Sequence, residues 1–332
     1  MMVPLTVVGT SRRAWATVSV ALGVALLAHI VIGGAMGADL TGAWRAFLGR
    51  DSVWSSVLWD IRLPRALACV FVGAILGSSG AAFQLLFRNP LAEPFVIGVS
   101  GGAAVMVTAF MSLGLTGLTL ELGSILAAII GGFGALSLVL TLASMRRGFR
   151  SESVLIAGAV VSSMLLSLMT VVLLSTGKDS SEIVRWMLGS ASPMYWSRVA
   201  ILFVTLMSGG WALLRECRRL NALSLGELSA RSLGVDPQRS GRTVLLAVTV
   251  MASIAVGATG IIGFLGIIAP NISRRIVGPD ARLVVPLSGC LAACLLLAAD
   301  LIAQRALPGQ ELPVGAVTAV LGAPALLWVL KR

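Results

Sequence analysis

The feature that most constrains the fold is a series of long apolar runs. One extends from Pro64 to Phe87, and a helix of that length matches the thickness of a bilayer. A spanning helix needs roughly 20 mostly apolar residues, so 332 residues have room for about eight to ten spans. Apolar residues make up 57% of the chain and charged residues 12%, against about 45–50% and about 25% in soluble domains. We therefore expect an all-α integral membrane protein, with residues 1–332 forming a single domain.

The apolar runs predict ten membrane segments. The third and eighth are rich in Gly and broken by Pro, and broken helices at membrane depth are tolerated only against protein or a watery cavity. A short amphipathic piece, 181–189, is expected to lie outside the bilayer core. The ten predicted segments are 14–34, 63–87, 95–114, 119–144, 153–175, 195–214, 243–258, 260–275, 281–303 and 312–330.

Basic residues gather on one side of this topology. An even number of spans puts both termini on the same side, which then carries 17 of the 25 basic residues: Arg12, Arg13, Arg88, Arg146, Arg147, Arg150, Arg215, Arg218, Arg219, Arg231, Arg239, Arg242, Arg274, Arg275, Arg282, Lys331 and Arg332. The larger share of Lys and Arg marks the cytoplasmic side. Both termini are therefore predicted to be cytoplasmic, and the net charge of +11 needs no nucleic-acid partner.

Motifs for catalysis, nucleotide hydrolysis and metal binding are missing from the sequence. The chain has two lysines, Lys178 and Lys331, and neither belongs to a P-loop, so we do not expect this polypeptide to hydrolyse ATP. The single histidine, His29, is interpreted as a packed, hydrogen-bonded residue. The cysteines fit neither a zinc site nor a disulfide framework: Cys69, Cys217, Cys290 and Cys294. No enzyme activity, bound metal or cofactor is expected of the chain itself.

The source of energy follows from a further absence. An ion-coupled transporter needs an ionisable group at mid-membrane depth, where charge is costly. The nearest candidates, Glu121 and Asp300, fall toward the ends of their predicted segments. The chain is therefore expected to draw energy from a partner. An ion-coupled secondary transporter is the less favoured alternative, and a membrane scaffold or receptor is another.

Two long motifs resemble one known family. They read RLPRALACVFVGAILGSSGAAFQLLFRNPLAEPFVIGVSGG, residues 62–102, and GATGIIGFLGIIAPNISRRIVGPD, residues 257–280. Both are similar to the permease subunits of FecCD/BtuC-type ABC importers, and the likeness continues to about Leu330. The resemblance implies about ten spans in a type II ABC importer permease architecture. It also implies a homodimer in the bacterial inner membrane, two separate ATPase subunits that bind Mg-ATP, and a periplasmic substrate-binding protein.

The resemblance also implies a class of substrate. Members of the family import ferric siderophores, haem or cobalamin. A cavity formed by two subunits is wide, and the chain has no dedicated metal ligands, so we expect a large metal chelate as cargo. A ferric siderophore is favoured because it represents the largest branch of the family, while haem and cobalamin stay open.

A polar segment between the sixth and seventh spans gives the strongest match. It reads RRLNALSLGELSARSLGVD, residues 218–236, which is too polar to span and is patterned as one or two short helices. Glu227 and Arg231 are spaced to pair at i,i+4. The segment resembles the family's coupling loop, which seats in a groove of the ATPase; a helix lying passively on lipid is the alternative. The residues that the resemblance implicates in coupling are Leu223, Leu225, Gly226, Glu227, Ala230, Arg231, Leu233 and Gly234.

Arginines at the opposite side are candidates for docking the binding protein. Arg62 and Arg65 flank Pro64, where they could simply be interfacial anchors with buried stems. By resemblance they lie where carboxylates of the binding protein dock, and such rim pairs mainly set register and encounter rate. The family's third arginine corresponds to Gln304 here, and this chain has Arg305 instead. A shift of one residue turns a helical side chain by about 100°, which puts this third contact in question.

Two broken stretches are predicted to border the pathway. One contains Asn89, Pro90 and Pro94, and the other contains Pro270 and Asn271. The family commonly has Pro-His at the second stretch. Because Asn cannot titrate or ligate a metal as imidazole does, we interpret Asn271 as satisfying a helix break rather than contacting substrate.

Overall fold

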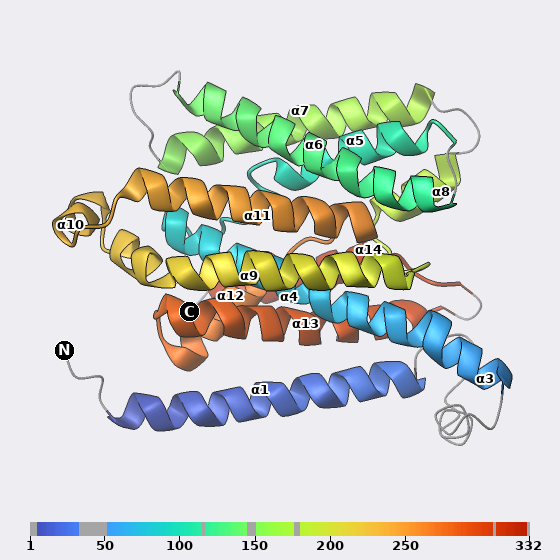
Figure 1. The fold of residues 1–332 in the computed structure, drawn as a ribbon, viewed down its shortest axis with the longest axis horizontal. Helices are drawn as coiled ribbons and strands as arrows, with labels where there is room; N and C mark the ends of the chain where they lie inside the picture. The colour runs from blue at the N-terminus through green and yellow to red at the C-terminus, as the bar shows by residue number, and fades with distance from the viewer. Residues whose placement is uncertain are drawn as a thin grey trace.

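The computed structural model describes residues 5–32, 52–114, 117–144, 151–175, 180–307 and 310–330. Throughout this part of the chain the regular structure is helical, apart from one isolated bridge between Leu307 and Gln310 (Figure 1). The predicted all-α membrane fold is therefore confirmed. The helices are α1 (Leu5–Ile32), α3 (Ser52–Ser56), the π-helical η1 (Val57–Arg62), α4 (Leu63–Phe87), α5 (Val99–Met111), α6 (Gly117–Ser144), α7 (Ser151–Ser175), α8 (Ser180–Met187), α9 (Trp196–Ser224), α10 (Glu227–Ser232), α11 (Pro237–Thr259), α12 (Leu265–Val277), α13 (Ala281–Arg305) and α14 (Val314–Leu330).

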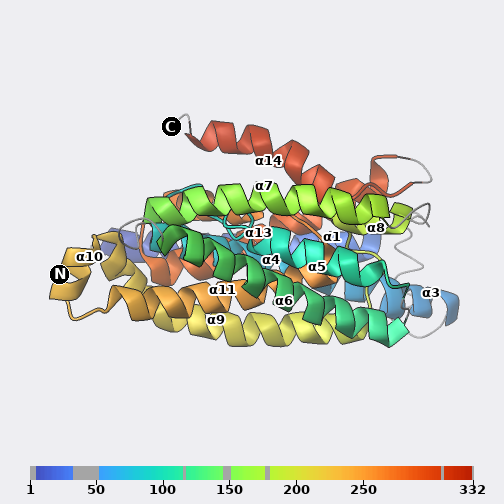
Figure 2. The ribbon, with the colours of Figure 1, turned by 90° about the horizontal axis from the view of Figure 1, so that it is seen from above.

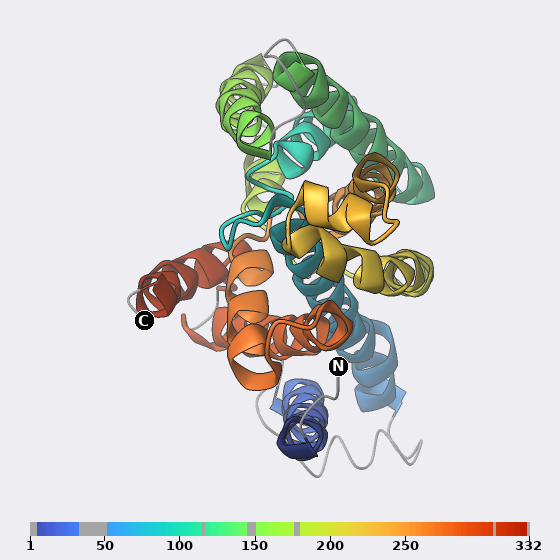
Figure 3. The ribbon, with the colours of Figure 1, turned by 90° about the vertical axis from the view of Figure 1, so that its left-hand side faces the viewer.

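The long helices lie side by side in one elongated bundle. The short helix α10 lies at one end, and α3 and α8 lie at the other; we call these the α10 end and the α8 end (Figure 1). Helix α1 begins and α14 finishes toward the α10 end (Figures 1 and 2). Seen along the bundle, α4 passes through the middle, with α5, α6 and α7 on one side and α13 and α1 on the other (Figure 3).

Seven of the described helical stretches are long and apolar enough to cross a bilayer. They correspond to the first, second, fourth, fifth, sixth, seventh and ninth predicted segments. The other three predicted segments contain shorter helices: α5 and α12 have 13 residues each and α14 has 17. Helices α5 and α12 begin late because Gly98 and Phe264, just before them, have φ angles of 86° and 68°, which cannot continue a right-handed helix.

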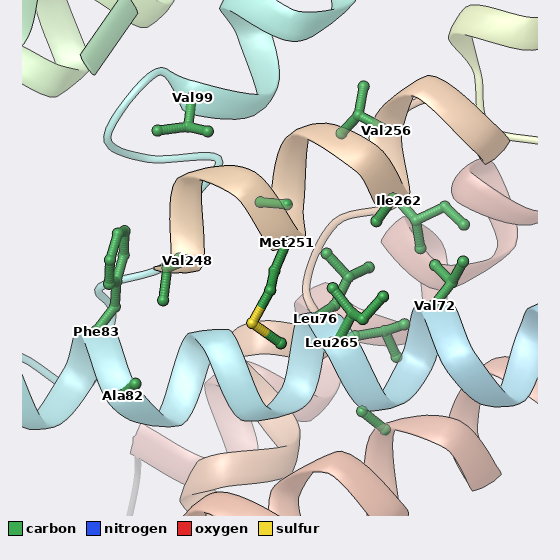
Figure 4. Close-up of a cluster of buried hydrophobic side chains, with 14 of the residues drawn as sticks. Val72, Leu76, Ala82, Phe83, Val99, Val248, Met251, Val256, Ile262 and Leu265 are labelled. Atoms are coloured by element: carbon green, nitrogen blue, oxygen red, sulfur yellow. The ribbon is translucent and has the colours of Figure 1, made fainter. Parts of the chain in front are cut away.

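Close backbone contacts hold α4 at the centre of the bundle. A Cβ on Gly73 would lie 2.6 Å from Ala293 Cα of α13, and one on Gly80 would overlap the carbonyl oxygen of Gly266. Small residues allow this approach where larger side chains would hold helices apart. On the opposite face of α4, Met251 of α11 points toward α4 among other buried apolar side chains, including Phe83 (Figure 4).

Two predicted boundaries at the α10 end were wrong. Helix α9 continues ten residues beyond the predicted end at 214, and α11 begins at Pro237 rather than at 243. Both boundaries were placed where the apolar run ends, but polar residues beyond the bilayer surface can also adopt helical structure. Helix α11 starts at Pro237 because the Asp236 carboxylate caps it, accepting from the backbone nitrogens of Gln238 and Arg239 at 2.9 and 3.4 Å.

Some sequence predictions fall beyond the described residues. Residues 33–34 of the first predicted segment lie there. So do five of the basic residues used for the topology, together with the lysine of the 176–179 stretch: Arg146, Arg147, Arg150, Lys331, Arg332 and Lys178.

Candidate functional site

The predicted coupling segment forms the last turns of α9, the short helix α10 and the turn into α11. Gly226 opens α10 with a φ of 109°, and Gly234 closes the turn after it with a φ of 75°. Both values favour glycine, because a Cβ strains the backbone there. The Gly226 carbonyl accepts from Ala230 N at 2.9 Å, and the Ala230 carbonyl accepts from Val235 N at 2.9 Å. The segment is therefore a compact, internally bonded knob.

Three leucines project from this knob. Leu225, Leu228 and Leu233 are 68%, 84% and 63% exposed, whereas Leu223 and Ala230 are buried against the bundle. Apolar side chains gathered at a polar end of the molecule are typical of a surface that a partner or a membrane covers. We call these three residues the leucine face.

The predicted ion pair across α10 is not formed. Among the described residues, Glu227 and Arg231 are both exposed and no ion pair joins them. The prediction from spacing was wrong because an exposed pair contributes at most about 1 kcal/mol, which does not ensure that two long side chains are held together. Their charges remain available on the surface of the knob.

One amide joins the coupling segment to α13. Asn221, in the last turn of α9, donates from Nδ2 to Asp280 Oδ1 at 2.8 Å, and its Oδ1 accepts from Ala281 N at 2.8 Å. Asp280 also caps α13 by accepting from Arg282 N at 3.0 Å. Burial raises the pKa of Asp280, but the hydrogen bonds from Asn221 and Arg282 and the charge of Arg282 outweigh it and hold the pKa below its ordinary value. The carboxylate is therefore ionised at neutral pH.

The second predicted helix break is satisfied by side chains. Pro270 lies inside α12 and has no N–H to offer the Gly266 carbonyl one turn earlier. Gln84 of α4 donates to that carbonyl at 3.0 Å instead, and its amide oxygen accepts from Arg274. Asn271 donates to Ile267 O at 2.7 Å. Gln84 therefore supplies the donor that the Gly266 carbonyl lacks, and the role of Asn271 stays a prediction.

The first break packs against the second. Asn89 follows the left-handed Arg88 that ends α4, and its Oδ1 accepts from Leu91 N at 2.9 Å. The exposed Pro90 accepts at its carbonyl from Asn271 Nδ2 at 3.1 Å, which ties the two breaks together. Pro94 is buried. The geometry brings four of the five predicted pathway residues into two adjoining turns, and their place on a pathway stays a prediction.

A buried ion-pair cluster occupies the α8 end; we call it the Arg65 cluster. It consists of Arg65 of α4, His29 of α1, Asp300 and Gln304 of α13, and Glu311 of the following loop. Arg65 donates through Nε and Nη2 to the two oxygens of Asp300 at 2.9 and 3.0 Å, and through Nη1 to both oxygens of Glu311 at 3.0 Å. His29 Nε2 and Gln304 Nε2 each lie 2.7 Å from Asp300 Oδ2.

The predicted docking arginines are distributed unevenly around this cluster. Arg65 is 7% exposed and Arg62 is 5% exposed, and Arg62 Nη1 donates to Ile30 O and Val31 O of α1 at 3.1 Å. Arg305 is exposed, while Gln304 turns inward to the cluster. At position 304, where the family has its third arginine, this chain therefore turns an amide toward the cluster. The guanidinium of Arg305, one residue later, lies on the surface. Docking by these arginines stays a prediction.

Three potential metal ligands also meet in the cluster. Atoms of His29, Cys69 and Asp300 lie within 4.8 Å of one another, and all three residues are buried. The Arg65 guanidinium already binds both oxygens of Asp300, so a second cation there would face a positive charge at contact distance. We therefore interpret the group as an ion-pair cluster rather than a metal site.

Comparisons with known proteins agree with this architecture. The model of the FecCD transport family matches residues 21–332. The uncharacterized ABC transporter permease protein YvrB of Bacillus subtilis is 36% identical over 310 residues, or 92% of this chain and 84% of that protein. The vitamin B12 import system permease protein BtuC of Klebsiella pneumoniae is 38% identical over 279 residues, or 83% of this chain and 82% of that protein.

Solved structures give the same result. One was determined in an inward-facing conformation and is provisionally assigned as a metal-chelate type ABC transporter. It has a TM-score of 0.83 and 28% identity, covering 95% of this chain and 97% of that one. PsaBC from Streptococcus pneumoniae shares the fold at a TM-score of 0.59 and 15% identity, covering 83% of this chain and 93% of that one.

Proposed function

This chain belongs to the FecCD transport family of ABC importer permeases, and from that membership we propose that it conducts a metal chelate across a bacterial inner membrane as one half of a homodimer. Permeases of such importers work with ATPase subunits and substrate-binding proteins. The observation that carries the proposal is the leucine face around α10, an exposed apolar surface within the segment that matches the family's coupling loop. ATP hydrolysis then takes place on the ATPase subunits, and this chain needs no metal or cofactor of its own.

The mechanism uses the two ends of the bundle in turn. The leucine face inserts into a groove of the ATPase, and closure of the ATPase pair around ATP displaces α10. Leu223 and Ala230 are buried beneath that face, so the displacement reaches the bundle rather than bending the knob alone. The bundle then exposes its cavity to the opposite side of the membrane.

The α8 end faces the binding protein in this proposal. Arg305 is exposed at this end. Arg65 is held inside the chain, where Glu311, itself 37% exposed in its side chain, occupies one edge of its guanidinium. A carboxylate of the binding protein would exchange with Glu311 at that edge. Both termini lie on the cytoplasmic side under the same orientation.

The identity of the chelate is open among three candidates. A ferric siderophore is favoured because it represents the largest branch of the family. Cobalamin is supported by the 38–40% identity to vitamin B12 permeases over 83% of this chain. Haem is the third possibility that the family offers. All three are large metal chelates, which suits a pathway between two copies of the chain.

Reconstitution tests the proposal. The permease would be placed in liposomes with its ATPase and supplied with binding protein loaded with ferric siderophore, cyanocobalamin or haem. We expect uptake of one chelate that requires ATP and binding protein together. Uptake that persists without ATP would contradict the proposal and favour a secondary transporter, and partner binding without any flux would favour a scaffold.

A further inference from the structure

We propose that Asn221 is a positioning residue that passes displacement of the coupling segment to α13. This inference rests on the proposed function, because it concerns how that segment drives the permease. Asn221 lies in the last turn of α9, about one helical turn before the leucine face begins at Leu225. It contacts the first residues of α13, about 60 positions later in the sequence.

The contact has the chemistry of a two-point clamp. The Asn221 amide donates to the Asp280 carboxylate and accepts from Ala281 N, both at 2.8 Å. Only a side chain with both a donor and an acceptor at this reach can make the pair of bonds. The clamp holds α13 at its N-cap and at its first backbone N–H, so it fixes the start of that helix in position and in rotation.

The clamped helix is rigidly connected to the rest of the molecule. Along its length α13 packs on α4 through backbone rather than through flexible side chains: a Cβ on Gly289 would lie 3.2 Å from Ala74 O, and one on Gly73 would lie 2.6 Å from Ala293 Cα. Contacts of this kind leave little room for one helix to move without the other. A displacement at Ala281 therefore moves α4 as well.

The far end of α13 carries the Arg65 cluster. Asp300 there binds Arg65 of α4 and His29 of α1. Gln304, one helical turn after Asp300 on α13, donates to the same carboxylate. The coupling segment and the proposed docking end are thus joined through one helix with polar clamps near both of its ends. The Asn221 clamp is the contact through which displacement of the coupling segment reaches α13.

Coupling measurements on the reconstituted importer test the assignment. The variants are Asn221→Ala, which removes both bonds, and Asn221→Asp, which keeps the acceptor but sets a second carboxylate against Asp280. Asp280→Asn is the conservative variant, because asparagine caps helices well and can still accept from Asn221. Gln238→Ala, an exposed amide in the first turn of α11, is the matched control. The readout is chelate transported per ATP hydrolysed, with thermal stability and ATPase pull-down measured alongside.

We expect both Asn221 variants to lower this ratio at least about fivefold while the ATPase still binds, because a coupling contact typically changes a linked equilibrium by that much or more. Asp280→Asn and Gln238→Ala are expected to stay within about twofold of the unmodified protein. A merely structural defect would lower transport and permease-stimulated ATP hydrolysis together and leave their ratio unchanged. That outcome, or an unchanged ratio with both activities intact, would overturn the inference. Failure of the unmodified protein to transport with ATP would instead refute the proposed function.

Discussion

The Arg65 cluster provides a quantitative test, because it combines a buried charge pair with apolar surroundings. Asp300 is fully buried and receives bonds from Arg65, His29 and Gln304. Replacing one partner of a buried ion pair leaves the other charge without compensation, at a cost of about 3–5 kcal/mol. Arg65→Met is expected to lower the free energy of unfolding by about that amount. Asp300→Leu is expected at the lower end of the range, because Arg65 keeps its bonds to Glu311.

The double variant separates the ion pair from other effects. If the two changes acted independently, they would together cost about 6–8 kcal/mol. Replacing both charges with apolar side chains of similar size is often close to neutral, and the remaining cost is about 1–3 kcal/mol for donors such as Gln304 Nε2 that lose their acceptor. We therefore expect a coupling energy of about 3 kcal/mol or more in favour of the pair.

The assay is equilibrium unfolding in mixed detergent micelles, followed by circular dichroism, for the unmodified protein and the three variants. Asp60→Asn serves as the control, since Asp60 is an exposed carboxylate toward the same end of the bundle. Its effect is expected within about 0.5 kcal/mol. If the double variant equals the sum of the singles within about 0.5 kcal/mol, Arg65 and Asp300 do not stabilise one another and the reasoning fails.

Three further predictions concern packing, the helix break and the leucine face. Gly80→Ala should cost about 1–3 kcal/mol in the same unfolding assay, because its Cβ would overlap the Gly266 carbonyl, whereas Gly134→Ala, with open space around it, should be neutral; equal effects would contradict the close contact. Gln84→Leu should cost about 1–3 kcal/mol by leaving the Gly266 carbonyl without its donor, and a melting temperature matching that of Gln238→Leu would argue against this role. Leu228→Asp should abolish ATPase pull-down yet leave unfolding unchanged, because Leu228 is 84% exposed; retained pull-down would exclude the leucine face as the contact.

The membrane class and most spans could be predicted from the sequence because bilayer thickness imposes a length on apolar runs. The breaks near Gly98 and Pro270 were also readable, since Gly and Pro mark positions where a helix cannot simply continue. Helix ends at the α10 end were not, because polar residues of α9 continue a helix as readily as they form a loop. The capping of α11 by Asp236 is visible in the sequence as Asp-Pro, since Asp favours the N-cap and Pro the first helical position.

The parts of the candidate site formed by neighbouring residues in the sequence could be predicted. The parts formed by contacts between distant segments could not. Gly226 and Gly234 mark the ends of α10, and the short helix itself follows from the polar pattern of residues 218–236. The Arg65 cluster brings together five residues from four parts of the chain, and only the i,i+4 spacing of Asp300 and Gln304 signals it. A basic and an acidic residue in two otherwise apolar helices, such as Arg65 in α4 and Asp300 in α13, indicate a buried pair.

The bond from Asn221 to Asp280 had no signal in the sequence. A single asparagine near a helix end is ordinarily read as a local cap, and its partner lies about 60 residues away. Tertiary packing of α9 against α13 creates the contact, so periodicity cannot anticipate it.

The central claim is that this chain moves its cargo only when a separate ATPase acts on α10. The most direct measurement is chelate uptake into sealed proteoliposomes that hold the permease alone under an imposed proton gradient, compared with vesicles that also hold the ATPase and ATP. The account predicts uptake only in the second preparation, and loss of that uptake in the Leu228→Asp variant. Gradient-driven uptake by the permease alone would contradict it.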